Sequence, residues 1–365
     1  MSGVRVQAQL AQRGVDFDVA LDDGEVLAVL GPNGVGKSTL LMMIAGLLRP
    51  DQGRIELGGK VVADTRTGTF VPAHARGAAM LSQQALLFPH MTAAENVAYA
   101  PRCKGQSRSH ARATARRWLD AVDAGHLADR KPAQLSGGQA QRVAVARALA
   151  AEPRVLLLDE PMAALDVAAA PALRRLLREI LRDNGRTAII VTHDLLDALA
   201  IADKVIIIED GHVVEGGPVR RVLSAPRSDF AARIAGINLV PGVVSGPGVI
   251  RTSWGTDIGG LGDLDPGVAA IALFRPAAVA VHLEPPHASP RNVLAVTIAE
   301  LDVHGTTVRI RGVDQPDGGT GLAADVTAAA AADLALEPGR TVYFVVKAQE
   351  VELHPALATA RTAGR

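Results

Sequence analysis

The chain has 365 residues, which is long enough for two domains that each bury a hydrophobic core. Its 38 Lys and Arg residues balance its 38 Asp and Glu residues, and aromatic residues make up only 3% of the chain. This composition differs from that of proteins that bind nucleic acids through basic or base-stacking surfaces, so we expect no nucleic-acid partner.

The sequence also gives no indication of a membrane-spanning or secretory segment. The single cysteine, Cys103, excludes an internal disulfide and favours the cytosol. Acidic residues, including Asp16 and Asp18, stand where a signal peptide would need an apolar stretch. Apolar runs such as Leu40–Leu48 fall short of the ~20 residues that span a bilayer. Any membrane role is therefore expected to depend on a partner.

The first strong signal is a short apolar run followed by a glycine-rich loop and a helical segment. Val26–Leu30 predicts a buried strand, and Lys37–Leu48 predicts a helix that ends before Pro50. Between them stands the pattern G-x-x-x-x-G-K-[ST], whose backbone N–H groups wrap nucleotide phosphates, whose lysine reaches the β- and γ-phosphates and whose serine binds Mg²⁺. The expected nucleotide-binding residues are Gly31, Pro32, Asn33, Gly34, Val35, Gly36, Lys37, Ser38 and Thr39.

Further along, a predicted hairpin (Arg54–Leu57 and Lys60–Val62) precedes a glutamine and then a helical stretch from Thr92 to about Asp129. The amide of Gln83 can contact Mg²⁺ or the attacking water and still move with its loop, which suits a sensor better than a base. The neighbouring Gln84 is the competing candidate.

A second glycine-containing segment opens the predicted helix Ala140–Ala151. Its hydroxyl and glycines present backbone donors to a phosphate at the start of a helix. Because the two phosphate-binding segments are far apart in the sequence, we expect two chains to hold ATP between them. The residues expected to act across this dimer are Ser136, Gly137, Gly138 and Gln139, which follow Leu135.

Two apolar strands, Val155–Leu158 and Ala188–Val191, end in polar residues. Parallel α/β sheets place their ligands at the carboxyl ends of the strands. Asp159 is expected to bind Mg²⁺ together with Ser38 and Gln83, and Glu160 to act as the general base. His193 is expected to contact the γ-phosphate. A solvated turn and a structural histidine are the alternative interpretations, and the upstream glycine loop favours catalysis.

Composition changes after about Ala235. Glycine and proline become frequent, and short strand-like runs separated by turns predict a small, OB-like β-barrel. We expect an α/β ATP-binding domain over residues 1–235, a Gly/Pro-rich linker with β segments over 236–288, an all-β domain over 289–355 and a tail over 356–365. The runs are Ala277–Leu283, Val293–Leu301, Val308–Gly312 and Val342–Val346.

The order of these segments resembles that of ATP-binding cassette (ABC) transporter ATPases, which implies a P-loop NTPase fold with a helical subdomain. Ala85–His90 and Val191–Asp194 resemble importer ATPases in particular. In the tail, Ser289–Leu294, Ala324–Thr327 and Val346–Ala348 resemble the Mop (TOBE-type) domain of molybdate importer ATPases.

This resemblance implies an ATP- and Mg²⁺-dependent motor for molybdate or tungstate import. The partners would be a second copy of the chain, two permease subunits and, through them, a substrate-binding protein, at the cytoplasmic face of the membrane. Importers of sulfate, ferric ion, polyamines or sugars, an oxyanion-sensing regulatory ATPase and a soluble ABC ATPase are the alternatives. The tail either braces the dimer or binds an oxyanion, through Ser289, Asn292, Thr327 and Lys347.

Two positions depart from the family pattern. Related ATPases often stack adenine on an aromatic residue upstream of the glycine loop, where this chain has Ala8, Gln9 and Leu10, and Phe17 is out of place. A serine common after the catalytic glutamate is Ala163 here. Base selectivity is therefore expected to be loose, and one hydrogen bond across the dimer is expected to be missing.

Overall fold

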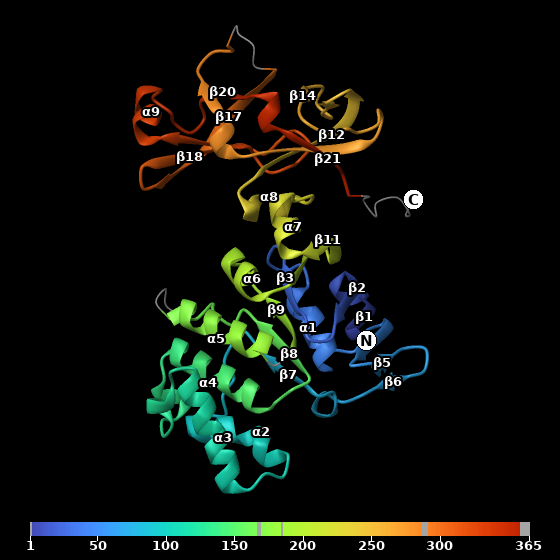
Figure 1. Cartoon of the computed structure of the whole chain (residues 1–365), viewed down its shortest axis with the longest axis vertical. Helices are drawn as coiled ribbons and strands as arrows, with labels where there is room; N and C mark the ends of the chain where they lie inside the picture. Colours follow the sequence, from blue (N-terminus) through green and yellow to red (C-terminus); the bar gives the residue numbers. More distant parts are fainter. Residues whose placement is uncertain (1, 166–168, 184, 287–290, 358–365) are drawn as a thin grey trace. The chain divides into compact units, whose positions relative to one another are not determined.

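An eleven-stranded mixed sheet organises the first part of the chain (Figure 1). The computed structural model describes residues 2–165, 169–183, 185–286 and 291–357, and the chain divides into two units, 1–220 and 221–365. The first unit is α/β and the second is mainly β, which confirms the predicted fold class. The units are described separately below.

The sheet of the first unit combines a parallel half with an antiparallel half. Strand β3 lies between β10 and β9, and β8 and β7 continue the parallel half. Every residue of β3, β8 and β9 is buried, as expected for strands covered on both faces. In spatial order the strands are β6 (Thr69–Phe70), β5 (Lys60–Asp64), β4 (Gln52–Leu57), β1 (Ser2–Leu10), β2 (Val15–Asp22), β11 (His212–Pro218), β10 (Lys204–Glu209), β3 (Val26–Leu30), β9 (Thr187–Val191), β8 (Val155–Asp159) and β7 (Ala78–Leu81).

The sequence analysis did not identify β1, β2 and β7. Strand β2 alternates strictly between buried and exposed residues, so a period-two search would have found it. Its buried residues pack with those of β1 against helix α1 in one hydrophobic core that includes Val6, Phe17, Leu41 and Ile44.

Helices cover this sheet and also form a separate cluster in which α2, α3 and α4 pack against one another (Figure 1). Helix α1 ends at Ala45, earlier than predicted, because Gly46 adopts a left-handed conformation (φ 81°) that closes the helix. The helices are α1 (Lys37–Ala45), α2 (Ala93–Cys103), α3 (Arg108–Ala121), α4 (Gly137–Ala150), α5 (Ala169–Asp183), α6 (Leu195–Ile201), α7 (Val219–Ser224), α8 (Asp229–Ala235) and α9 (Ala328–Asp333).

The second unit contains two antiparallel five-stranded sheets that share one core. Val240 and Phe274 from the first sheet pack in the same cluster as Leu294 and Phe344 from the second. Residues 236–286, which lie in the segment expected as a Gly/Pro-rich linker with β segments, contain the strands β12–β16 of this β unit. The sheets are β14 (Asp257–Gly259), β13 (Val249–Arg251), β12 (Asn238–Gly246), β15 (Ala269–Phe274) and β21 (Glu352–Pro355), and β16 (Ala280–His282), β20 (Thr341–Val346), β17 (Asn292–His304), β18 (Thr307–Gly312) and β19 (Ala323–Thr327).

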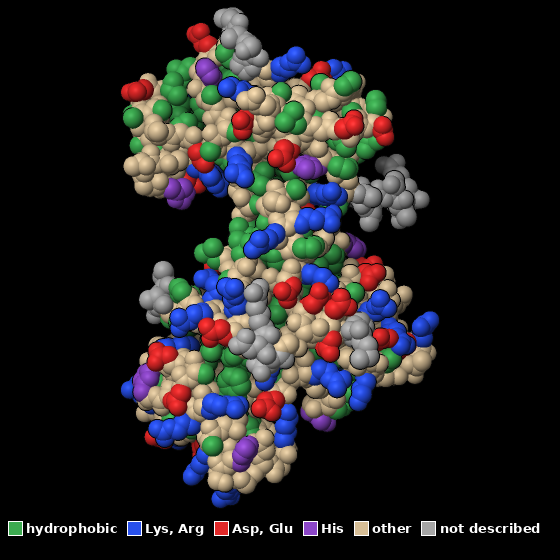
Figure 2. All heavy atoms as spheres, viewed as in Figure 1, with side chains coloured by type: hydrophobic (Ala, Val, Ile, Leu, Met, Phe, Trp, Pro, Cys, Tyr) green, Lys and Arg blue, Asp and Glu red, His purple; other side chains and the backbone are tan. Residues whose placement is uncertain are grey.

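The surface carries both signs of charge. On the face that Figure 2 shows, basic and acidic side chains are interspersed over the first unit, in keeping with the formal net charge of +0. In the described part of the chain, no helix is long and apolar enough to cross a membrane. The same residues hold no cluster of three or more His, Cys, Asp or Glu side chains arranged to bind a metal ion.

Candidate functional site

The glycine loop lies between β3 and α1, and two of its glycines leave no room for a side chain. Gly31 has φ 151°, and a Cβ there would lie 2.2 Å from the carbonyl oxygen of Ile208. Gly36 has φ 101°, and a Cβ there would lie 2.6 Å from a methyl group of Val15. Glycine permits both the positive φ and this close approach. The loop therefore presents its backbone where phosphates would bind.

Lys37 is the first residue of α1, directly after this loop, and is only 7% exposed. Its Nζ donates hydrogen bonds to the carbonyl oxygens of Gly31 (2.8 Å) and Pro32 (2.7 Å). Burial lowers the pKa of the ammonium, and the charges of Glu160 and Asp159 oppose that shift. Because phosphate oxygens are stronger partners for an ammonium than neutral carbonyls, this arrangement suits the binding of a triphosphate.

Asp159 ends β8 and is 6% exposed. Burial raises the pKa of its carboxyl group and the nearby Glu160 raises it further, whereas a hydrogen bond with Ser38 and the charge of Lys37 lower it. A hydroxyl and a carboxylate next to each other fit the oxygen-rich coordination that Mg²⁺ prefers. The side chains of Ser38 and Asp159 are therefore suited to hold that ion.

Glu160, Gln83 and His193 come together at the carboxyl edge of the sheet. Glu160 has a left-handed backbone (φ 48°), and its side chain is 16% exposed. Its Oε2 accepts a hydrogen bond from Nε2 of Gln83 (3.0 Å), and its Oε1 lies 3.7 Å from Nδ1 of His193. Gln83, rather than the competing Gln84, is thus the glutamine whose side chain reaches the predicted base.

These groups line a single cleft of about 700 Å³. The cleft also contains Arg13, which the sequence analysis missed because it lies in the short turn Ala11–Arg13 between β1 and β2, far from any motif. Its Nη1 donates a hydrogen bond to Oγ1 of Thr39 (3.0 Å). The lining residues are Arg13, Asn33, Gly34, Gly36, Lys37, Ser38, Thr39, Gln83, Asp159, Glu160, Val191 and His193.

The sequence analysis also missed a network of hydrogen bonds behind His193. Arg174 of α5 donates to Oδ1 of Asp197 through both Nε (2.8 Å) and Nη2 (2.6 Å), and its Nη2 donates to Asp194 (3.1 Å). Oγ1 of Thr192 donates to the other oxygen of Asp197 (2.8 Å) and accepts from the N–H of Asp194 (3.0 Å). Both residues beside His193 are therefore held in place by these bonds.

The segment Leu135–Gln139 does not contribute to this cleft among the residues that the structure describes. Ser136 caps α4: its Oγ accepts from the N–H of Gln139 (3.3 Å), and the side chain of Gln139 accepts from the N–H of Ser136 (3.0 Å). Ser136 and Gly137 are exposed. These donors thus stand at an accessible helix start, available to another molecule.

Among the described residues of the predicted oxyanion set, Asn292 and Thr327 lie at opposite ends of β17. Ser289 lies outside the described residues. Asn292 is buried at one end of β17, where its amide makes two hydrogen bonds with the backbone of Gly259, and Lys347 follows its strand neighbour Val346. Thr327 caps α9 and lies beyond the opposite end of β17, across β18. Asn292 and Thr327 thus have structural partners at separate places.

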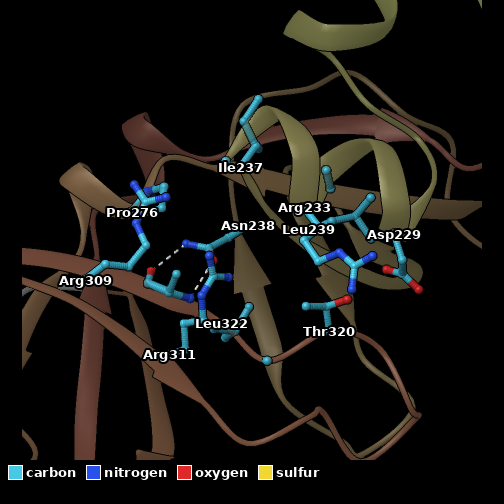
Figure 3. A pocket seen from close by; sticks show the side chains of 14 residues that line it. Asp229, Arg233, Ile237, Asn238, Leu239, Pro276, Arg309, Arg311, Thr320 and Leu322 are labelled. Carbon is cyan, nitrogen blue, oxygen red and sulfur yellow. Dashed lines mark hydrogen bonds between the residues drawn. The ribbon is translucent and has the colours of Figure 1, made fainter. Parts of the chain in front are cut away.

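Another pocket of the second unit contains three arginines, and Figure 3 shows it from close by. Arg309 pairs with both oxygens of Asp325, Arg311 lies 3.2 Å from Glu300, and Arg233 lies over the ring of Phe230. Each arginine therefore has a partner. The amide of Asn238 joins the pocket wall through two hydrogen bonds to the backbone of Ala323, drawn as dashed lines.

A phosphate-binding loop after one buried strand, with Asp159, Glu160 and His193 after two neighbouring strands, defines a P-loop nucleoside triphosphatase. The ABC transporter family model matches residues 15–163, and the TOBE domain model matches residues 288–353. The chain belongs to the ATP-binding proteins of ABC transporters and is a transport ATPase.

Similar proteins cover different shares of the chain. The molybdenum import ATP-binding protein ModC of Mycobacterium tuberculosis (strain H37Rv) is 54% identical over 98% of both chains. The Fe(3+) ions import ATP-binding protein FbpC of Agrobacterium fabrum is 44% identical over 62% of this chain and 63% of its own. A solved structure, the dimeric ATP-binding cassette MJ0796 in a post-hydrolysis state with ADP and Pi, matches with a TM-score of 0.53 and 31% identity, and covers 60% of this chain and 99% of that one.

Proposed function

We propose that this chain is the ATP-hydrolysing subunit of an importer for molybdate, which also accepts tungstate. The assignment of molybdate as the substrate rests on the extent of the alignment with the mycobacterial ModC protein, which spans both units at 54% identity. The alignment with the ferric ion protein of Agrobacterium covers 62% of the chain. An importer of another substrate remains the second candidate because the ATPase unit is common to both relatives.

The geometry of the cleft supports specific roles in hydrolysis. Lys37 and the loop N–H groups bind the β- and γ-phosphates. Ser38 and Asp159 would hold Mg²⁺, which would supply positive charge to neutralise the phosphates. A water molecule attacks the γ-phosphorus, its proton passes to the Glu160 carboxylate, and the bond to the β–γ bridging oxygen breaks to leave ADP and phosphate. Gln83 and His193, at 3.0 and 3.7 Å from Glu160, position the water and the γ-phosphate.

The assembly is proposed to be a homodimer that closes on two ATP molecules. The exposed start of α4, with Ser136, Gly137, Gly138 and Gln139, offers N–H donors that a phosphate at a partner's glycine loop would accept. A solved relative with 31% identity is described as a dimer. The chain's own cleft lacks these donors, so a second copy completes it.

The permease partners are proposed to bind near the loop that carries Gln83. The chain would then lie at the cytoplasmic face of the membrane. Leu86 is 65% exposed and Tyr99 is 42% exposed, and the ring of Tyr99 packs on Phe88 at 4.8 Å. Arg147 of α4 donates to the carbonyl oxygens of Leu86 (2.9 Å) and Ala85 (3.1 Å). A permease segment resting on this apolar surface would therefore contact the loop that carries Gln83. A substrate-binding protein would act through the permease.

An uptake experiment tests the substrate. Cells that lack their own molybdate importer ATPase would receive this chain together with its permease subunits, and cellular molybdenum, tungsten and iron would be measured by mass spectrometry. We expect molybdenum uptake that competes with tungstate and disappears in the Glu160→Gln variant. Restored iron uptake without molybdenum uptake would instead assign the chain to the ferric ion class.

A further inference from the structure

Helices α2 and α3 concentrate positive charge in a chain whose formal net charge is +0. Residues 96–119, which cover most of both helices, hold six Lys and Arg residues and no Asp or Glu. On the face that Figure 2 shows, basic side chains stand at the end of the first unit where Figure 1 places these helices. None of the six lines the nucleotide cleft. They are Arg102, Lys104, Arg108, Arg112, Arg116 and Arg117.

Three of these arginines form a line along α3. Arg108, Arg112 and Arg116 stand four positions apart, so they follow one flank of the helix over about 12 Å. All three are exposed, whereas Ala111 and Trp118 of the same helix are buried. The helix is therefore anchored by its apolar residues and presents these three arginines, here called the basic stripe, to the outside.

Other side chains of the described chain do not neutralise the basic stripe. Among the residues that the structure describes, the guanidinium groups of the basic stripe make no hydrogen bond or ion pair. Arg117, by contrast, lies 3.7 Å from Glu152 and 5.1 Å from the ring centroid of Trp118. The positive charge of the basic stripe is therefore available to an anionic partner.

The basic stripe belongs to the same helical cluster as the proposed permease surface. Helix α3 packs on α2, and α2 carries Tyr99, which lies on that surface with Leu86. A chain that docks on a membrane-embedded permease through this cluster brings the basic stripe near the headgroups of the bilayer. Guanidinium groups pair well with phosphate, whereas a single-stranded nucleic acid would need a stacking surface, and the tryptophan of α3 is only 8% exposed. An anionic lipid surface therefore fits this face best.

We propose that the basic stripe binds the anionic phospholipid headgroups of the membrane and gives this ATPase a membrane contact in addition to its permease. The choice of a lipid partner rests on the proposed location of the chain at the membrane. Each basic residue close to such a surface strengthens binding roughly fivefold, and the attraction extends over one Debye length, about 8–10 Å. Three guanidinium groups thus provide a contact that is reversible and sensitive to salt.

Sedimentation of the full-length chain with vesicles, in the absence of a permease, tests the basic stripe directly. Vesicles of phosphatidylcholine alone would be compared with vesicles that contain about one third phosphatidylglycerol. We expect binding to the anionic vesicles only, and a partition coefficient about 100-fold lower for the triple variant Arg108→Gln/Arg112→Gln/Arg116→Gln. The corresponding triple lysine variant should bind nearly as well as wild type, because it keeps the charge. Raising the ionic strength from about 0.05 M to about 0.5 M should release wild type, because the Debye length shortens.

The matched control, Arg5→Gln/Arg66→Gln/Arg175→Gln, removes the same charge from three exposed positions outside α2 and α3 and should bind the anionic vesicles nearly like wild type. All variants should hydrolyse ATP like wild type without vesicles, because the substituted residues lie outside the cleft. Equal binding of wild type and the triple glutamine variant of α3, or an equal loss in the control, would overturn the proposal. Tighter binding of a DNA duplex than of anionic vesicles would assign the basic stripe to nucleic acid and overturn it as well. A lack of ATP hydrolysis by wild type would instead contradict the proposed function.

Discussion

At the residue scale, Glu160 shows how the backbone places a reactive group. The strand before it is fully buried, and the N–H of Glu160 donates to the carbonyl oxygen of Val191 on the neighbouring strand (2.9 Å). Its left-handed φ of 48° turns the chain directly after Asp159. Such a conformation is costly for a non-glycine residue, and its presence beside the cleft accords with a functional role.

We expect Glu160→Gln to lower ATP hydrolysis by about 10²–10⁴-fold, because the amide cannot accept the proton of the attacking water. Binding should persist, since the glutamine oxygen can still accept the hydrogen bond from Gln83. Steady-state phosphate release and titration with ATP would measure the two effects.

The matched control is Glu152→Gln, which only removes an exposed contact with Arg117 (3.7 Å) and should keep wild-type turnover. Near wild-type turnover in Glu160→Gln would exclude this residue as the base.

At the element scale, a network of hydrogen bonds links α5 to the loop that carries His193. The side chain of Arg174 is only 16% exposed, and its guanidinium donates hydrogen bonds to both Asp197 and Asp194. The backbone on both sides of His193 thus depends on α5, the helix that precedes β9.

Arg174→Met is expected to lower kcat about tenfold and to leave the KM for ATP nearly unchanged, because misplacing a catalytic group slows chemistry more than binding. Arg174→Lys should recover only part of the rate, since lysine lacks the fork. Kinetics of both variants would be compared with Arg175→Met, whose side chain is 79% exposed and lies 3.8 Å from Glu179. A raised KM with an unchanged kcat would contradict a positioning role.

Strand pairing in the second unit offers a test of electrostatics with an internal control. Arg309 and Asp325 face each other across β18 and β19 and form two hydrogen bonds (2.7 and 2.8 Å). This pairing lowers the pKa of the Asp325 carboxyl group, mainly through the hydrogen bonds from Arg309. Arg251 and Asp257 form the same type of pair across β13 and β14, with side chains that are 59% and 48% exposed.

In a double-mutant cycle with Arg309→Ala and Asp325→Ala, we expect a coupling of up to about 1 kcal/mol at neutral pH. Because the folded-state pKa of Asp325 lies below its unfolded value, this stabilisation is present above the unfolded pKa and is lost as the pH falls through the folded one.

Urea unfolding would be followed by the fluorescence of Trp254 in a Trp118→Phe background, since the chain has 2 tryptophans. The Arg251–Asp257 cycle should give a smaller coupling. A coupling for Arg309–Asp325 that persists undiminished in strong acid would refute the assignment to charge.

At the scale of the whole molecule, the proposed composite site combines two separate parts of the first unit. Lys37, Asp159 and Glu160 line the cleft, whereas the donors of Ser136–Gln139 stand elsewhere on the first unit. Hydrolysis is therefore expected to require two copies, with each start of α4 facing the other's glycine loop.

Mixing inactive Lys37→Ala protein with inactive Ser136→Arg protein should restore part of the ATPase activity, because a mixed dimer retains one intact composite site. Phosphate release would be measured after the heterodimer has been verified by differential tags. The control mixture, Lys37→Ala with the double variant Lys37→Ala/Ser136→Arg, has no intact site and should stay inactive. Verified heterodimers without any recovery would contradict a shared site that turns over alone.

Much of the nucleotide site could be predicted from the sequence because its signals are local. The glycine spacing from Gly31 to Gly36 and the polar residues after two apolar strands each depend on a few adjacent positions. The buried strands β3, β8 and β9 and the β-rich tail were likewise predicted, since continuous apolar runs and turn-rich composition need no knowledge of distant partners.

Only the tertiary structure decided which distant residues meet. It joined Arg13 to Thr39, selected Gln83 over Gln84 beside Glu160, and placed Arg174 behind His193. It also separated Asn292 from Thr327 and brought Val240, Ile258 and Phe274, from the segment expected as a linker, into the core of the β unit. These outcomes depend on strand order, register and burial between segments far apart in the chain, which local residue patterns do not encode.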